Sequence, residues 1–168
     1  MKRLILTLVL AFATVVAASA QNYMVVNSEK VFKSIDAYNK ALEKIESLAA
    51  DYQKQVDAKF KEVETLYNSY VQQRASMPES TRQQYEATIL NLEAEATKFQ
   101  ESLFGNDGEL MKQRVELIQP IQAKVFGTIE SFSQQNGYDL VIDLASNPTL
   151  LYYSPKVDFT DKIIEALK

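Results

Sequence analysis

The 168-residue sequence contains no cysteine and no histidine, and only four glycines and four prolines. Without cysteine it can form no disulfide, use no thiolate chemistry and carry no lipoprotein anchor. Without histidine, a histidine-based catalytic triad, a histidine metal site and a histidine pH switch are excluded. The sequence therefore lacks the usual ligands of zinc, and we expect neither a metal site nor a cofactor.

Motifs for nucleotide binding and acid–base chemistry are also weak. Residues 105–108, Gly-Asn-Asp-Gly, form the one glycine cluster, but they lack the Gly-Lys-Ser/Thr ending and the preceding strand of a phosphate loop, so ATP use is unsupported. Asp139 and Asp143 lie four apart on a predicted strand and could act as paired acids or bind calcium. Ordinary solvated strand residues are the commoner case. We therefore assign no catalytic residue and do not expect an enzyme.

The first twenty residues have the composition of a secretory signal peptide. Lys2 and Arg3 precede an apolar run from Leu4 to Ala17, and the small residues of 18–20 predict cleavage after Ala20. No later stretch is apolar enough to span a bilayer, so we expect no stable membrane insertion. Cleavage leaves 16 basic residues against 22 acidic ones, a formal net charge of −6. Without a basic patch, nucleic acid is not an expected partner.

Apolar residues recur in a heptad pattern from Asp36 to Gln135, which predicts two long helices folded into an antiparallel hairpin. The first seam comprises Leu42, Ala49, Val56, Val63 and Tyr70 at one heptad position and Ile45, Tyr52 and Leu66 at the other. The second seam comprises Tyr85, Ile89, Leu92, Ala96, Phe99 and Leu103. Residues 76–80, Ser-Met-Pro-Glu-Ser, supply the reversal, with Ser76 as the helix-capping candidate. The alternative is an ordinary compact bundle, which needs a further long helix.

The second long helix changes character beyond Gly108. Its seam there is Met111, Val115, Ile118, Val125, Ile129 and Phe132, joined by Leu110, Leu117, Ile121 and Phe126. The seam thus shifts by one residue between Leu103 and Met111. Gly105, Gly108 and Pro120 predict a joint, which is either a mobile hinge or a fixed kink. We expect alanine at both glycines to raise thermal stability slightly.

Short elements flank the hairpin. We predict strands at 23–26, 138–144 and 150–153, a short helix ending at Lys33, and a last helix at 160–167 opened by a capping box of Asp158 and Asp161. The fold class is therefore α+β, mostly α. The arm, residues 36–110 with its tip near 76–80, is a long antiparallel helical hairpin of coiled-coil type. The small β-rich body for oligomerisation comprises residues 21–35 and 111–168.

The body is too small to bury its own apolar residues, and its strand edges would stay unpaired in a monomer, so we expect an oligomer. The residues predicted at or near the core of that assembly are Val25, Phe32, Leu140, Ile142, Leu151 and Tyr153. On the arm, Val71, Leu90 and Phe104 fall outside the seams. They are either scattered surface residues or a contact surface for another chain.

Several of these segments resemble one family. The sequence resembles the Skp/OmpH family of periplasmic chaperones in the charged hairpin and in four short segments. These are 23–32, Tyr-Met-Val-Val-Asn-Ser-x-x-Val-Phe, then Ile121-Gln122, residues 137–143, and the final Asp158-Phe159-Thr160-Asp161. The resemblance covers essentially the whole mature chain.

That resemblance implies a periplasmic homotrimer with three helical arms around a cavity. The cavity would hold unfolded outer-membrane proteins without ATP and prevent their aggregation. Val71, Leu90 and Phe104 are then candidate client contacts. The best-known family members are strongly basic, whereas this mature chain is acidic, which sets it apart in how clients would be captured. The alternative function is a structural coiled-coil spacer or scaffold of the cell envelope.

Overall fold

A computed structural model describes residues 22–168, which divide into two compact units. One unit is the hairpin, Ile35–Ala123. The other, here called the body, joins residues 22–34 with Lys124–Lys168. Helix α5 (Glu109–Asn136) contributes its first half to the hairpin unit and its second half to the body.

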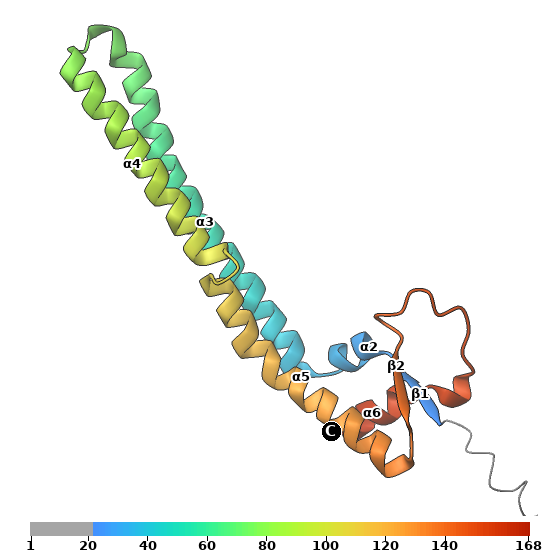
Figure 1. The fold of residues 1–168 in the computed structure, drawn as a ribbon. Helices are drawn as coiled ribbons and strands as arrows, with labels where there is room; N and C mark the ends of the chain where they lie inside the picture. Colours follow the sequence, from blue (N-terminus) through green and yellow to red (C-terminus); the bar gives the residue numbers. More distant parts are fainter. Residues whose placement is uncertain (1–21) are drawn as a thin grey trace, which may run out of the picture. The chain divides into compact units, whose positions relative to one another are not determined.

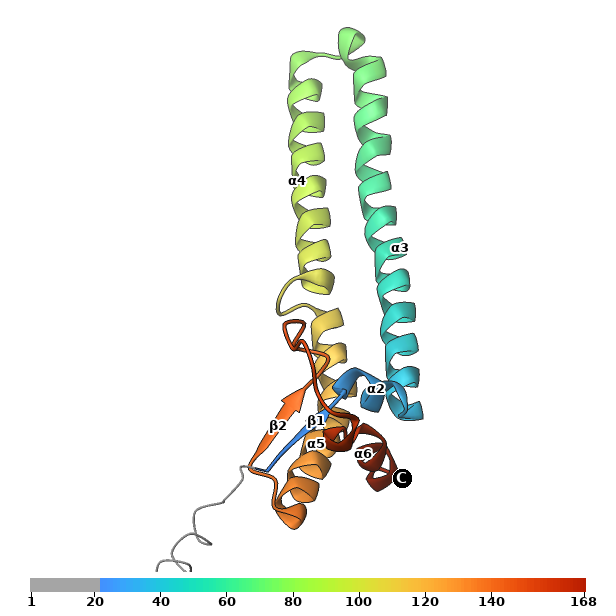
Figure 2. The same ribbon diagram turned by 90° about the vertical axis from the view of Figure 1, so that its right-hand side faces the viewer.

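The hairpin unit is built from two long helices that run antiparallel, as predicted. Helix α3 (Asp36–Gln73) has 38 residues, about 57 Å at about 1.5 Å per residue, and the short 3-10 helix η1 (Arg74–Ser76) begins the reversal. Helix α4 (Glu79–Phe104) returns alongside α3 (Figures 1 and 2). Ser76 does not cap α4, because its hydroxyl donates to the Gln73 carbonyl at 2.9 Å; Pro78 occupies the capping position instead.

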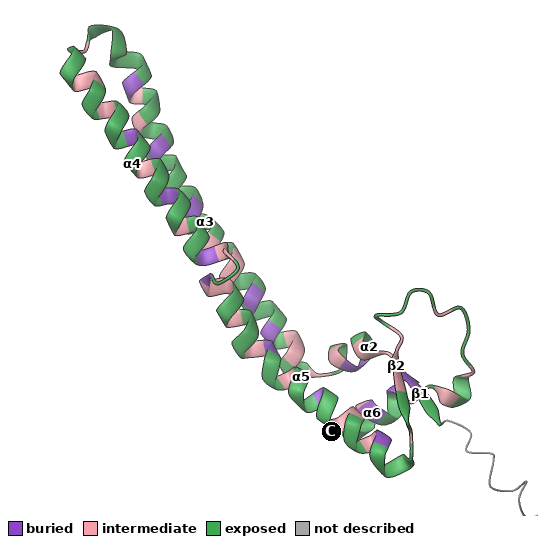
Figure 3. Ribbon diagram, viewed as in Figure 1, coloured by how far each residue is buried: buried purple, intermediate pink, exposed green. Residues whose placement is uncertain are grey.

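Buried residues line the facing sides of α3 and α4 (Figure 3). Val63, Tyr70, Ile89 and Ala96 form one core cluster, and Leu66, Tyr85 and Leu92 pack against it, so most of the predicted seam is confirmed. Tyr70 stacks on Tyr85 with ring centroids 6.1 Å apart. Its hydroxyl donates to Glu86, and this hydrogen bond together with burial and the carboxylate charge raises the pKa of Tyr70. Leu42, however, is exposed, because Ala41 and Ile45 take the inward positions at the base.

The returning side of the hairpin is interrupted between α4 and α5, at the predicted joint. Gly105 ends α4, its amide bonding to the Glu101 carbonyl at 2.8 Å, and the Gly108 amide bonds back to the Gly105 carbonyl at 2.9 Å. Pro120 causes no break, because α5 continues through it. The prediction that alanine fits here is wrong. A Cβ on Gly105 would lie 2.5 Å from the Glu101 oxygen, and one on Gly108 would lie 2.8 Å from the Leu103 oxygen.

The predicted one-residue shift of the seam after this break is wrong at the start of α5. Leu110, seven residues after Leu103, packs with Leu117 and Ile121 against the cluster of Ala41, Ile45 and Ile118. Met111 and Val115 are left exposed. Ile118 and Val125, which belong to the predicted seam, are buried, so the shift is found from Ile118 onward but not at Met111 and Val115.

The body contains a two-stranded parallel sheet made from distant parts of the chain. Strand β1 (Tyr23–Val26) pairs with β2 (Leu140–Asp143) from Tyr23 opposite Leu140 to Val26 opposite Asp143. On the other side of β1, the Phe159 amide donates to the Val25 carbonyl at 3.0 Å. The predicted strands at 23–26 and 138–144 are thus confirmed, and Gly137, with φ of +70°, follows the end of α5 in a left-handed conformation.

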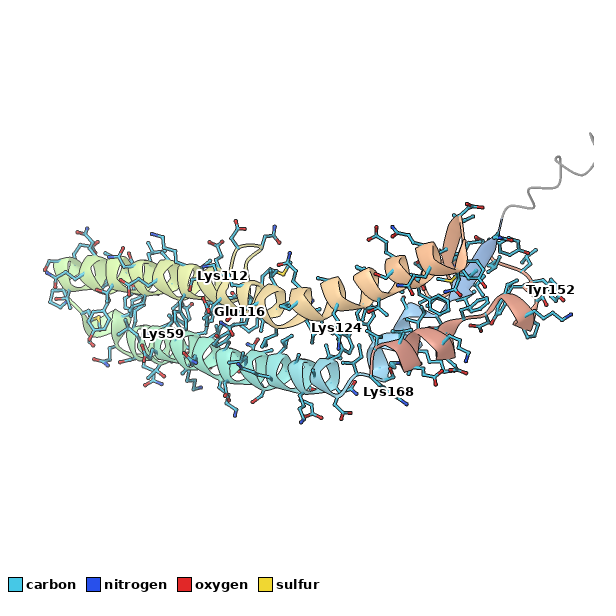
Figure 4. All side chains as sticks on the ribbon, turned by 90° about the horizontal axis from the view of Figure 1, so that it is seen from below. Lys59, Lys112, Glu116, Lys124, Tyr152 and Lys168 are labelled. Atoms are coloured by element: carbon cyan, nitrogen blue, oxygen red, sulfur yellow. The ribbon has the colours of Figure 1, made fainter. Side chains whose placement is uncertain are left out.

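Two short helices complete the body, α2 (Ser28–Lys33) and α6 (Thr160–Ala166). The Asn27 side chain accepts from the Lys30 amide at 2.9 Å and so caps α2. The body core is formed by side chains with almost no exposed surface: Met24, Val25, Val26, Val31, Val125 and Ile163. Lys124 Nζ donates to the Leu167 carbonyl at 3.2 Å, which ties α5 to the chain end near Lys168 (Figure 4).

Two predictions for the body are wrong. Residues 150–153 form no strand but part of the loop between β2 and the 3-10 helix η2 (Pro155–Val157), because no neighbouring backbone in the described chain pairs with them. The last helix is not opened by a capping box. Asp158 Oδ1 accepts from the Thr160 amide at 3.0 Å, whereas Asp161 forms an ion pair with Lys30 at 2.8 Å.

Candidate interaction surfaces

The three candidate contact residues of the hairpin lie in different environments. The Val71 side chain is 53% exposed and that of Leu90 is 64% exposed. Phe104, at the end of α4, is half-buried, with its ring edge-on to Tyr52 at a centroid distance of 6.4 Å. None of the three belongs to the hairpin core clusters.

Other exposed apolar residues of the hairpin occupy the same position relative to its core as these three. Val71, Leu90 and Phe104 each come directly after a buried residue, namely Tyr70, Ile89 and Leu103. The same holds for the exposed residues Leu42, Tyr67 and Met111, which follow the inward-facing Ala41, Leu66 and Leu110. This neighbour relation was present in the sequence. It becomes visible once the inward positions are known.

Met111 and the helix break form a shallow apolar site. A cavity of about 350 Å³ is lined by Asn106, Asp107, Met111, Lys112, Val115 and Glu116. A second one of about 190 Å³ shares Asn106 and Met111 with the first and is also lined by Phe104, Leu110 and Arg114. Lys112 and Glu116, labelled in Figure 4, belong to the rim of the larger cavity. Methionine adapts its shape to varied apolar partners, which suits an opening of this kind.

The residues predicted for the oligomeric core of the body divide into two groups. Val25 is fully buried within the single chain, and Phe32 and Ile142 are half-buried, Phe32 lying edge-on to Phe126 at 6.1 Å. Leu140, Leu151 and Tyr153 are exposed, Leu151 at 97%. Tyr152 extends from the same loop (Figure 4).

Asp143 connects β2 to the start of α2. Its carboxylate accepts from the Ser28 amide at 3.0 Å, the Ser28 hydroxyl at 2.8 Å and the Ser146 hydroxyl at 2.9 Å. Burial alone would raise the pKa of Asp143, but these hydrogen bonds outweigh it and hold the pKa below its ordinary value. The carboxylate is thus used as a structural acceptor. Asp139, the other predicted acid, accepts from the Asn22 amide at 3.3 Å.

The described residues contain neither a metal-binding cluster nor a membrane-spanning helix. Within residues 22–168, no group of three or more metal-ligating side chains could hold an ion. Over the same residues, no helix is both long and apolar enough to cross a membrane. The predicted signal peptide lies outside the described residues.

A long helical hairpin joined to a small parallel-stranded body defines an α+β class with helical arms. The family model for outer membrane protein (OmpH-like) matches residues 22–167, and the chain belongs to this family. Among solved structures, it is similar to an OmpH-like protein from Caulobacter crescentus CB15, described as a candidate outer membrane chaperone. That similarity has a TM-score of 0.63 at 12% identity and covers 90% of this chain and 86% of the other. No curated protein sequence matches significantly.

Proposed function

We propose that the protein is an ATP-independent holdase chaperone that binds unfolded outer-membrane proteins and keeps them from aggregating. The observation that carries this proposal is the set of exposed apolar side chains on the hairpin, Val71 and Leu90 among them, standing on otherwise polar helices. Scattered contacts of this kind hold a chain without imposing one conformation on it. Membership of the OmpH-like family supports the same function.

The active form is a homotrimer held together by the body. Exposed apolar side chains on the body, Leu140, Leu151 and Tyr152, support association. Burying each of them would contribute about 1.5–3 kcal/mol. Three arms in one assembly would also present many weak contacts to one client, so that multivalency supplies the affinity. The protein acts in the periplasm after removal of residues 1–20, binds no nucleic acid, and is not an enzyme.

The test combines aggregation and mass. The purified mature protein should suppress light scattering by an unfolded outer-membrane barrel in the absence of ATP, and the native mass should be that of a trimer, alone and with one client bound. A protein that leaves scattering unchanged would support the alternative, an envelope spacer or scaffold.

Variants separate the two surfaces. Replacing Val71, Leu90 and Phe104 by serine should weaken client retention while leaving trimer mass and helicity unchanged. Replacing Leu140 and Leu151 by aspartate should dissociate the trimer without unfolding the chain, because both side chains are already exposed in the single chain. Unchanged retention in the first variant would reject those residues as contacts, and an unchanged mass in the second would reject the body interface.

A further inference from the structure

The large exposed apolar residues of the hairpin lie on one face. Successive residues of an α-helix are about 100° apart, so a residue directly after an inward-facing one lies to one side of the interface. Seen from one end, two antiparallel helices wind in opposite senses. A residue that follows an inward position therefore lies on the same side of the hairpin whether it belongs to α3 or to α4 and α5. We call this side the forward face, and the side formed by the residues directly before inward positions the rear face.

The two faces differ sharply in apolar content. The forward face carries a set of large apolar side chains, six of them directly after an inward-facing residue. The six are Leu42, Tyr67, Val71, Leu90, Phe104 and Met111. Phe60, four residues after Val56 and three before Val63, is turned toward the same side by about 40–60°, and Val115 lies one helical turn beyond Met111. On the rear face the corresponding positions are polar or small in the main, as in Gln55, Ser69, Thr88, Asn91 and Ser102.

Charge distinguishes the forward face as well. Directly after Val56 and the members of the two hairpin core clusters, no residue is Lys or Arg, whereas five such residues are acidic; the half-buried Gln113 is followed by Arg114. The five acidic residues are Glu46, Asp57, Glu64, Glu86 and Glu93. The rear face includes the basic residues Lys40 and Lys44 beside its acids. The forward face therefore combines apolar contact with negative potential.

The spacing along this face suits an extended chain. Acidic and apolar residues interleave along α3, at Glu64, Tyr67 and Val71 for example, at intervals of three or four residues. Those intervals correspond to about 4.5–6 Å along the helix. Side chains on one side of an extended polypeptide recur at about 6.5 Å.

From these observations we propose that the forward face binds extended polypeptide segments in which apolar side chains alternate with Lys or Arg. The inference deepens the proposed function, on which it rests, by naming the class of client segment. Apolar side chains of the segment would contact residues such as Tyr67 and Leu90, and its basic side chains would lie against Glu64 and Glu93. The preference should weaken as salt screens the exposed charges.

The experiment measures binding of two synthetic peptides to the full mature protein by fluorescence anisotropy. One peptide repeats Leu-Ser-Lys-Ser, and the other has Glu in place of Lys, so that only the charge differs on the side that carries leucine. The wild-type protein should bind the Lys peptide roughly tenfold more tightly at low salt, and the ratio should fall as salt rises. Equal affinity for the two peptides would overturn the proposal.

Two triple variants provide the matched control. Glu46→Gln, Glu64→Gln and Glu93→Gln neutralise three acids of the forward face. Glu62→Gln, Glu95→Gln and Glu109→Gln neutralise three of the rear face. Each set loses one exposed ion pair, Lys61–Glu64 or Lys59–Glu62. The forward set should lose most of the preference for the Lys peptide and the rear set should retain it; an equal loss in both sets would show only an effect of net charge and overturn the proposal.

Failure of this inference is distinguishable from failure of the proposed function. Suppression of barrel aggregation without a charge preference among peptides would leave the holdase function standing and reject the forward face as a selective site. A charge preference that depends on the forward face, in a protein that does not suppress aggregation, would support the binding surface and reject the holdase function.

Discussion

Alanine substitution at Gly105 or Gly108 should destabilise the hairpin, although a helix normally gains from the replacement. In a helix interior, glycine costs about 1 kcal/mol relative to alanine. Here a Cβ would meet backbone atoms at 2.5 Å beside Gly105 and at 2.8 Å beside Gly108. Main-chain atoms cannot swing aside as a flexible side chain does. The strain of such overpacking is typically about 1–3 kcal/mol, so we expect a net loss of stability.

Gly127 provides the control within the same protein. It lies inside α5, and a Cβ there would meet no atom within 4 Å. Gly127→Ala should therefore raise the free energy of unfolding by about 0.5–1 kcal/mol. The three single variants are compared by urea denaturation followed by circular dichroism. If Gly108→Ala proves as stabilising as Gly127→Ala, the close backbone contacts beside Gly108 do not oppose a side chain there.

Further predictions concern the body. The hydrogen bonds to Asp143 lower its pKa in the folded protein, so they stabilise the fold fully above the unfolded pKa of about 4. This stabilisation is lost as pH falls through the lower pKa of the folded state. Asp143→Asn should therefore make the free energy of unfolding less dependent on pH in denaturant titrations between about pH 5 and pH 2. Ile163→Ala, at a fully buried position, should cost about 2–5 kcal/mol. Leu151→Ala should leave the fold of the chain unchanged, as seen by circular dichroism, and weaken self-association in sedimentation.

Local sequence determined most of the elements correctly. The heptad pattern predicted both sides of the hairpin. Strands were predicted at 23–26 and 138–144, and found at 23–26 and 140–143, because each is a short apolar run next to a clear turn or cap. Residues 150–153 have the same apolar character but no backbone partner in the described chain. Strand propensity describes a side chain that suits a sheet and does not supply the neighbouring strand.

The exact inward positions were harder to predict. A seam that allows Leu42 also allows Ala41, and only the packing against Ile118 selects the alanine. Met111 and Leu110 posed the same choice after the glycine turn. In both cases the inward residue is selected by tertiary contacts between residues about seventy apart in sequence. A prediction that is wrong by one position therefore also assigns the outward-facing residues wrongly. The one-sided forward face could be recognised only after those positions were known.

The pairing of β1 with β2 has a consequence for the order of folding. The Ser28 amide and the Asp143 carboxylate that join these parts are 115 residues apart in the chain. The hairpin, by contrast, closes locally at residues 74–78. Contacts between near neighbours in sequence form faster than those that require a long loop to close. Strand β1, including Val25, therefore stays unpaired during folding until β2, in the last third of the chain, is available to pair with it.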